Sequence, residues 1–187
     1  NVKDEFINAF INRAKKLKIG NGMDEGVNLG PLTTSKRLEE IEKLVDTTKK
    51  EGAKVLMGGK RPSGFNKGFY YEPTVFDKVE DNFTIMKEEP FGPLVPMLAF
   101  KTFDEVIERA NDNDLGLCSY LYTNSMDKAN RGSELLETGC VAVNTGAVAI
   151  AEAPFGGIKQ TGYGREGGSM AIKDYLNVKY THMALKV

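Results

Sequence analysis

Hydrophobic residues in the first fifty positions recur at steps of three and four, which is the spacing of amphipathic helices. A first helix is predicted over residues 2–17, ending before Gly20, with an apolar face of Phe6, Phe10, Ala14 and Leu17. A loop with glycine and proline follows, after which Thr34 or Ser35 is suited to cap a second helix. The predicted buried face of this second helix consists of Leu38, Ile41, Val45 and Thr48.

The next segments have the short apolar runs and the alternation of β-strands. Residues 53–57 form an apolar run that two glycines stop, which predicts a short strand. Residues 69–79 alternate weakly around Pro73. Because proline cannot donate a backbone hydrogen bond, this second strand is expected at the edge of a sheet or at a bend.

Strand and helix patterns alternate from residue 94 onward. The predicted strands are 94–100, 118–122 and 140–144, and the predicted helices are 104–111 and 125–136. Thr102 is placed to cap the first of these helices. Such alternation is typical of domains in which helices cover a buried, parallel sheet, so we predict an α/β fold with a largely parallel sheet and flanking helices.

The final part of the chain combines a glycine-rich loop with an alternating terminal segment. Six glycines lie within residues 156–168, which indicates a functional loop. A short helix is expected around residues 169–175, followed by a strand over residues 178–187. This strand has no neighbour in the alternating pattern, so we expect it to pair with another subunit.

Composition excludes several classes of protein. Lys and Arg number 25 against 26 Asp and Glu, and the net charge of −1 gives no field that attracts nucleic acid or an anionic membrane. No apolar run approaches the roughly 18 residues of a membrane span. Two cysteines, Cys118 and Cys140, are too few for a disulfide framework, and His182 is the only histidine. We therefore expect a cytoplasmic protein without a metal site, whose 187 residues form one large domain or one domain with an appendage.

Gly162 to Gly167 match the G-x-G-x-x-G pattern of dinucleotide-binding loops. In those loops the pattern follows a buried strand and opens a helix within a βαβ unit. Residues 157–161 are not an apolar strand, and no pattern of a parallel strand follows the loop. We therefore interpret these glycines as a structural loop.

Three segments, taken together, resemble the aldehyde dehydrogenase superfamily. They are the turn Glu88-Glu89-Pro90-Phe91-Gly92-Pro93, the strand Gly139-Cys140-Val141-Ala142-Val143-Asn144 and the loop from Pro154 to Glu166. Singly, each is also explained as a charged turn, a strand end or a loop. In this order they match the superfamily, and the last nearly repeats its P-F-G-G-x-K-x-[ST]-G-x-G-R-E pattern. The resemblance implies a catalytic domain over residues 1–168, and a helix with an oligomerisation strand over residues 169–187.

The resemblance also implies roles for individual residues. Glu89 would hydrogen-bond the nicotinamide ribose of NAD or NADP, and Phe91 would pack near the nicotinamide ring. Phe155 would line the aldehyde pocket, and Ala149 stands where a serine binds the substrate in one subfamily. In this superfamily a cysteine thiolate attacks the aldehyde to give a thiohemiacetal, the hydride passes to NAD(P), and a glutamate activates the hydrolytic water.

We expect three parts of the enzyme upstream of Asn1: the nucleophilic cysteine, the glutamate that acts as the general base, and the cofactor-binding domain. Cys118 and Cys140 match core positions instead, where cysteines are usually inert. No catalytic residue is therefore predicted within the chain, and the isolated polypeptide is predicted to be inactive.

Several sequence segments between Val143 and Tyr180 resemble those of bacterial succinate-semialdehyde dehydrogenases. This resemblance implies oxidation of succinate semialdehyde to succinate. Ala149 replaces their serine, so related semialdehyde and lactaldehyde-type enzymes remain open. The resemblance further implies a homodimer or homotetramer assembled through the C-terminal strand. The alternative is a non-catalytic module that keeps the fold for interaction alone, but Glu89, Phe91 and the glycine-rich loop favour the enzyme.

Overall fold

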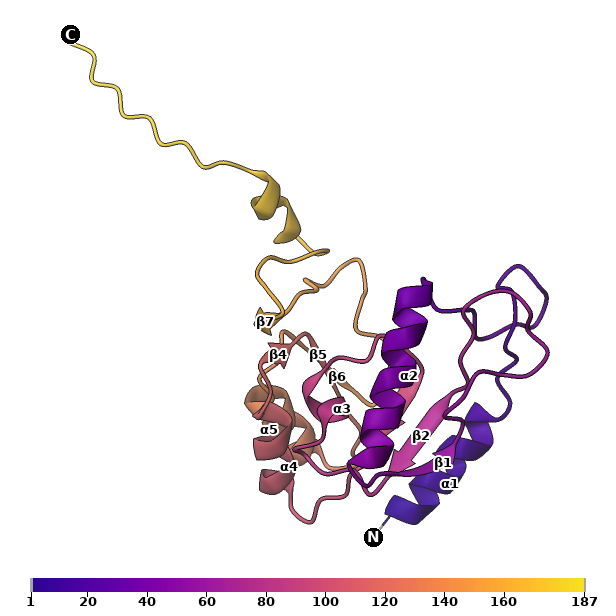
Figure 1. Ribbon diagram of the computed structural model, residues 1–187. Coiled ribbons are helices and arrows are strands. Elements are labelled where there is room, and N and C mark those ends of the chain that lie inside the picture. Colours follow the sequence, from indigo (N-terminus) through magenta and orange to yellow (C-terminus); the bar gives the residue numbers. More distant parts are fainter. Residues whose placement is uncertain (1, 187) are drawn as a thin grey trace. The chain divides into compact units, whose positions relative to one another are not determined.

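A computed structural model describes residues 2–186, and the chain forms two compact units, Asn1–Ala99 and Phe100–Val187 (Figure 1). Both units combine helices with small sheets, which confirms the predicted α/β class. The division into residues 1–168 and 169–187, which separates a catalytic domain from an oligomerisation segment, stays a prediction.

The first unit is built on a three-stranded sheet in the order β1-β2-β3. Its strands are β1 (Lys54–Met57), β2 (Thr74–Asp77) and β3 (Leu94–Pro96). β1 runs antiparallel to β2, and β3 runs parallel to it. The edge position expected from Pro73 is therefore wrong, because the strand begins one residue later: Thr74 N–H is free to donate to Pro93 O, 2.8 Å away.

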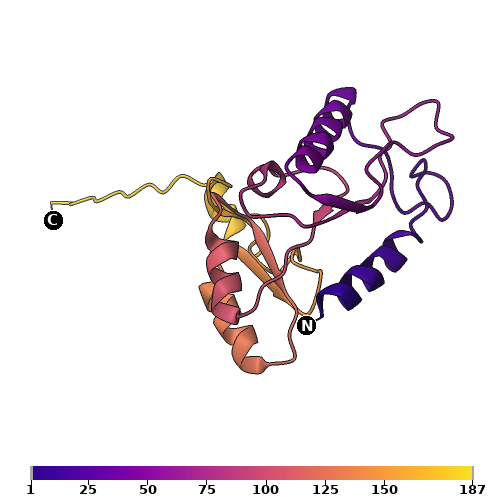
Figure 2. The same cartoon turned by 60° about the horizontal axis from the view of Figure 1, so that its bottom comes forward.

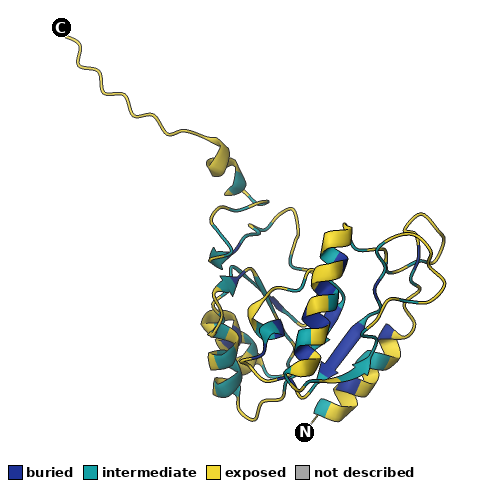
Figure 3. Ribbon diagram, in the orientation of Figure 1, coloured by how far each residue is buried: buried dark blue, intermediate teal, exposed yellow. Residues whose placement is uncertain are grey.

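Two long helices cover this sheet, and Figure 2 shows α1 (Lys3–Ala14) and α2 (Ser35–Lys50) on opposite sides of the β1–β2 pair. Of the two predicted candidates, Thr34 caps α2, since its hydroxyl accepts a hydrogen bond of 3.1 Å from Arg37 N. The apolar face of α2 is buried against the sheet (Figure 3). The buried residues of α2 are Leu38, Ile41, Leu44, Val45 and Thr48, which include all four that were predicted.

The first helix turns a different face inward from the one predicted. Its buried residues are Ile7 and Ala14, whereas Phe6 is 57% exposed and Leu17 lies beyond the helix end. Apolar residues occupy a wide arc of this helix, and the sheet covers only part of that arc. The apolar spacing alone therefore predicted Phe6 as a buried residue, whereas the next residue, Ile7, is the one that is buried.

The second unit contains two pairs of strands. β5 (Cys118–Leu121) and β6 (Cys140–Val143) are parallel, and β4 (Leu115–Gly116) and β7 (Ile158–Lys159) are antiparallel. The predicted parallel arrangement thus holds for β5–β6 here and for β2–β3 in the first unit, but in small separate sheets.

Two helices of the second unit pack side by side, α4 (Phe103–Asn111) and α5 (Met126–Leu135) (Figure 1). Thr102 and Ser125 cap them through their hydroxyls. The Arg131 guanidinium of α5 lies 4.8 Å from the centre of the Phe103 ring of α4. Gly132 lets α5 approach β5 closely, since a Cβ there would lie 2.5 Å from Leu121 Cδ2.

The chain after the glycine-rich loop forms a short 3₁₀ helix, Ala171–Tyr175, close to the expected position. Residues 176–186 are then exposed and have no strand partner, so the expected terminal strand is not formed in the part that the structure describes; Val187 lies outside it. A strand is defined by backbone hydrogen bonds to a neighbour, and a single copy of this chain offers none to this segment.

Candidate functional site

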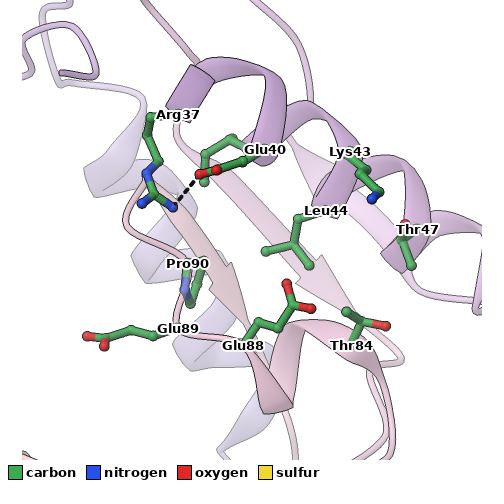
Figure 4. Close-up of a pocket in the computed structure, with 10 residues that line it drawn as sticks. Arg37, Glu40, Lys43, Leu44, Thr47, Thr84, Glu88, Glu89 and Pro90 are labelled. Atoms are coloured by element: carbon green, nitrogen blue, oxygen red, sulfur yellow. Dashed lines mark ion pairs between the residues drawn. The ribbon is translucent and has the colours of Figure 1, made fainter. Parts of the chain in front are cut away.

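A groove of about 420 Å³ in the first unit contains the turn that the sequence singled out (Figure 4). It lies between α2, the four-residue helix α3 (Thr84–Lys87) and the turn that follows α3. The residues that line it are Arg37, Glu40, Ile41, Lys43, Leu44, Thr47, Thr84, Glu88, Glu89 and Pro90. The groove therefore combines charges of both signs with an apolar floor.

The turn from Glu88 to Pro93 is held by its own backbone and by α2. Gly92 N–H donates to Pro90 O at 2.6 Å, and Leu94 N–H donates to Gly92 O at 2.8 Å. A Cβ on Gly92 would lie 2.5 Å from Cδ1 and 2.9 Å from Cγ1 of Ile41, a side chain that is only 1% exposed. Glycine is thus required for the close approach of the turn to the helix.

The helix α3 that leads into this turn is stabilised from the end of α2. Phe83, the residue before α3, provides no side-chain cap. Glu51 supplies the missing acceptor: its carboxylate accepts Thr84 N–H at 3.1 Å and the Thr84 hydroxyl at 2.6 Å. Sequence reasoning missed Glu51, because its partner lies 33 residues away and no local pattern connects them.

Glu89 and Phe91 lie in the same turn and both face solvent. Glu89 is exposed, its side chain points away from α2 in Figure 4, and no hydrogen bond or ion pair engages it within residues 2–186. Phe91 is 65% exposed, and the Arg37 guanidinium lies 5.7 Å from its ring centre. Arg37 also pairs with Glu40 at 2.9 Å. The turn therefore exposes a free carboxylate and, two residues later, an aromatic ring. A carboxylate can accept hydrogen bonds from a sugar diol, and an aromatic ring can pack against a planar group.

Arg37 is a second residue that sequence reasoning missed. Its position, three residues after the cap Thr34, indicates only a surface residue of the first turn of α2. Its contact with Phe91 depends on the packing of the turn against the helix, which no spacing in the sequence reveals.

Phe155 lies in the second unit and lines another groove, of about 390 Å³. Its backbone pairs with Glu166 through two hydrogen bonds of 2.7 Å, which closes the glycine-rich loop on itself. Ala149 is exposed in the preceding loop and does not line this groove. The lining residues are Leu117, Phe155, Gly156, Gly157, Thr161, Gly162, Tyr163, Gly164, Arg165, Glu166, Asp174 and Tyr175.

The glycine-rich loop is organised by Arg165. The Arg165 Nη1 donates to Gly157 O at 2.9 Å and to Gly164 O at 2.7 Å, and its backbone N–H donates to Asp174 Oδ2 at 2.8 Å. The strand before the G-x-G-x-x-G pattern is only β7, which runs antiparallel to β4. These contacts support the interpretation of the pattern as a structural loop.

Within residues 100–186, two non-glycine residues have positive φ, and side-chain contacts hold both. Asn144, with φ 56°, exchanges two hydrogen bonds of 2.9 Å with the backbone of Thr123. Lys159, with φ 57°, donates from Nζ to Asn111 O at 2.8 Å and pairs with Glu137 at 2.7 Å. Both conformations cost free energy that such contacts offset, so these residues have structural roles here.

The two cysteines lack the surroundings of a nucleophile. Cys118 and Cys140 are half-buried free thiols on β5 and β6. Burial, together with the neighbouring Cys140, raises the pKa of Cys118 and disfavours its thiolate. Within residues 2–186, no group of three His, Cys, Asp or Glu side chains is placed to hold a metal ion, and no helix there is long and apolar enough to cross a membrane.

Comparison with known proteins identifies relatives along almost the whole chain. The family described as "Aldehyde dehydrogenase family" matches residues 1–181. The mitochondrial succinate-semialdehyde dehydrogenase of Oryza sativa is 40% identical over 183 residues, which are 97% of this chain and 34% of the relative. The glutarate-semialdehyde dehydrogenase of Pseudomonas putida is 43% identical over 179 residues, covering 96% of this chain and 36% of the relative. The chain thus spans about a third of the length of these relatives.

Solved structures give the same result. A succinate-semialdehyde dehydrogenase from Burkholderia pseudomallei superposes with a TM-score of 0.89 at 38% identity, over 93% of this chain and 36% of that one. An NAD⁺ complex of an aldehyde dehydrogenase from Bacillus cereus gives a TM-score of 0.91 at 40% identity, over 95% of this chain and 36% of that one.

Proposed function

Because the chain belongs to the aldehyde dehydrogenase family, we propose that it forms part of an NAD(P)-dependent enzyme that oxidises a semialdehyde to the corresponding acid. We propose succinate semialdehyde as its substrate. The observation that carries the proposal is the turn after α3, which exposes the free carboxylate of Glu89 and, two residues later, the ring of Phe91.

The residues of this turn fit the nicotinamide half of the cofactor. Glu89, with no competing partner within residues 2–186, can accept hydrogen bonds from the ribose hydroxyls, and Phe91 can shield one side of the nicotinamide ring from water. Arg37, stacked over Phe91, restricts that ring. When bound, NAD(P) accepts the hydride that leaves the aldehyde carbon.

Neither cysteine of this chain is proposed as the nucleophile. A family nucleophile must be available as a thiolate, whereas burial raises the pKa of Cys118, and the Cys140 thiol is directed at a backbone carbonyl, Gly156 O, 3.8 Å away. We therefore propose that the polypeptide of residues 1–187 does not oxidise aldehydes by itself, and that the reacting thiolate belongs to other parts of the enzyme.

The choice of substrate rests on relatives and on one position of this chain. Several relatives are named for semialdehydes, which carry a carboxylate at the far end. Ala149 has no donor for that carboxylate, so we propose that its binding groups come from outside the loop of Ala149. Phe155, held by its backbone pairing to Glu166, is proposed to line the aldehyde pocket.

Assembly through the C-terminal segment is the remaining part of the proposal. Residues 176–186 expose apolar side chains, with Val178 fully exposed and Tyr180 83% exposed. Pairing of this segment with a second subunit would cover them and satisfy its backbone. We propose a homodimer or homotetramer. If light scattering gives the same mass before and after deletion of residues 177–187, this assembly is wrong.

The experiment that tests the function expresses the polypeptide encoded by the complete reading frame beside the chain of residues 1–187. Each is assayed for reduced cofactor with NAD and with NADP, on succinate semialdehyde, glutarate semialdehyde, betaine aldehyde and lactaldehyde. We expect oxidation by the complete product, fastest with succinate semialdehyde, and none by residues 1–187. Activity of the shorter chain that is lost in Cys118→Ala or Cys140→Ala would contradict the proposed position of the nucleophile.

A further inference from the structure

Cys118 and Cys140 lie directly opposite each other in the parallel β5–β6 pair. The pairing is well defined on both sides of them: Cys140 N–H donates to Leu117 O at 3.0 Å, and Asn144 N–H donates to Leu121 O at 2.8 Å. The two residues are 22 positions apart in sequence, so only the fold brings the chain's two thiols together.

The register places both thiols on the same face of the pair. Opposite residues on neighbouring strands project to the same side of a sheet, and neighbouring strands lie about 4.8 Å apart. That spacing falls within the Cα separations of about 4.4–6.8 Å that disulfides span. The Cys118 side chain interacts with the Cys140 side chain, and both residues are half-buried rather than sealed in the core.

We propose that Cys118 and Cys140 form a reversible cross-strand disulfide when the protein meets a small-molecule disulfide such as oxidised glutathione. One cysteine thiolate attacks a sulfur of the small disulfide, whose S–S bond breaks and releases one thiolate. The second cysteine thiolate then attacks the protein sulfur of the mixed disulfide and expels the other thiolate. The two cysteines lose two protons and two electrons, and the small disulfide is reduced to two thiols.

Geometry makes this disulfide easy to reduce. Neighbouring strands lie about 4.7–4.9 Å apart, whereas the Cβ atoms of a relaxed disulfide are about 3.5–4.5 Å apart. The two strands must therefore move together slightly, and the strain makes the bond more reducible than a structural disulfide. Such a bond opens again when the surroundings return to reducing conditions.

The disulfide would also affect the glycine-rich loop. In the reduced protein the Cys140 thiol is a donor to Gly156 O, 3.8 Å away. Oxidation removes the proton of that thiol, so the Gly156 carbonyl loses a partner. Gly156 follows Phe155, and the redox state of the two strands is therefore transmitted to the segment that carries this aromatic side chain.

Mass spectrometry of the 187-residue chain tests the disulfide. The protein is incubated with oxidised glutathione near pH 8.5, about the ordinary pKa of cysteine, because burial raises the pKa of Cys118 and slows its reaction at lower pH. Free thiols should fall from two to none without a glutathione adduct, and return to two with dithiothreitol. Trypsin cuts at Lys128 and Arg131, so the bond should join peptide 110–128 to peptide 132–159.

Single substitutions provide the controls. In Cys118→Ser and in Cys140→Ser the remaining thiol should carry one glutathione, which shows that the reagent reaches it. One glutathione on each cysteine of the unchanged chain, a bond between two chains, or two unreacted thiols would each overturn the proposal. So would equal yields of the joined peptides from the folded chain and from the chain in denaturant.

A second measurement reports on the loop. In amide NMR spectra of the isotope-labelled chain, oxidation should shift the backbone resonances of Phe155, Gly156 and Gly157, while the resonances of residues in the middle of α2 should not change. Unchanged loop resonances after complete oxidation would overturn the coupling to Gly156. The disulfide does not depend on the proposed dehydrogenase function, and its failure would leave that function intact.

Discussion

The carboxylate of Glu51 decides, on this structure, whether the turn that carries Glu89 and Phe91 is ordered. The helix before that turn has four residues, too few to be stable by itself, and its first residue Thr84 is held by Glu51 at 3.1 Å through the backbone N–H and at 2.6 Å through the hydroxyl. Replacing Glu51 by Ala removes both interactions and leaves a half-buried N–H without its acceptor.

The size of the effect follows from the nature of these bonds. Hydrogen bonds to a charged group contribute about 1.5–3 kcal/mol, and each 1.4 kcal/mol is about a tenfold change in an equilibrium. Hydrogen exchange measures the local equilibrium directly, because the Glu88 amide donates to Thr84 O at 3.0 Å and exchanges when α3 opens. In Glu51→Ala we expect the Glu88 amide to exchange about 10- to 100-fold faster.

Two comparisons make the test specific. Glu39→Ala removes an exposed carboxylate of α2 and should leave the exchange of the Glu88 amide unchanged within about twofold. Thr84→Val removes only the hydroxyl bond and should give an intermediate rate. Amides in the middle of α2 should keep their protection in all three variants. If Glu51→Ala accelerates the Glu88 amide no more than Glu39→Ala does, Glu51 does not hold the turn.

Three further predictions concern Tyr71 in the core of the first unit and the two residues with positive φ, Asn144 and Lys159, in the second. Burial, the largest cause, raises the pKa of Tyr71 to about 12, above the unfolded value of about 10. The contribution of the neutral phenol to stability is therefore complete below pH about 10 and is lost as the pH rises towards 12. In an absorbance titration, Tyr71→Phe should remove the phenol that ionises near pH 12. Lys159→Met should lower the free energy of unfolding, measured with urea, by about 1.5–3 kcal/mol, because the side chain keeps its apolar length but loses the hydrogen bond to Asn111 O and the ion pair with Glu137. An unchanged unfolding midpoint would contradict a structural role for Lys159. Asn144→Gly should destabilise less than Asn144→Ala in the same assay, since only glycine adopts φ 56° without cost, and the reverse order would show that this backbone conformation is not what fixes the residue.

Elements with complete local signals were predictable from the sequence. The helix α2 has a capping threonine and an uninterrupted apolar spacing, and the structure confirms both its start and its buried face. The strands β5 and β6 are short apolar runs between turn residues, and they too lie within a residue of their predicted bounds. In these segments, local preference and tertiary packing favour the same structure.

Elements defined by distant partners were not predictable. β4 and β7 have two residues each and exist only because they pair with each other. The central place of β2 was missed because Pro73 was counted as part of the strand, although the ladder begins at the next residue. The first helix has apolar residues on more than one face, and which of them are buried, Ile7 and Ala14, depends on tertiary packing.

The candidate site shows the same division. Glu89, Phe91 and Phe155 are predicted from sequence motifs, because the turn and the loop that hold them are continuous in the chain, and their roles stay predictions. Arg37 and Glu51 act on that turn from α2, and their roles depend on packing between segments that are far apart in sequence. The pairing of Cys118 with Cys140 likewise follows from strand register and from nothing in their spacing.

The most direct test of the proposed function is the KM for NAD(P) of the polypeptide encoded by the complete reading frame, with Glu89→Gln compared with its neighbour Glu88→Gln. Both variants remove one exposed carboxylate from the same turn, but Glu88 points towards α2 in Figure 4, whereas Glu89 points away from it. We predict a KM about 10- to 100-fold higher in Glu89→Gln, from the loss of a charged hydrogen bond of about 1.5–3 kcal/mol, and little change in Glu88→Gln. Equal KM values in the two variants would contradict the assignment of this turn to the cofactor.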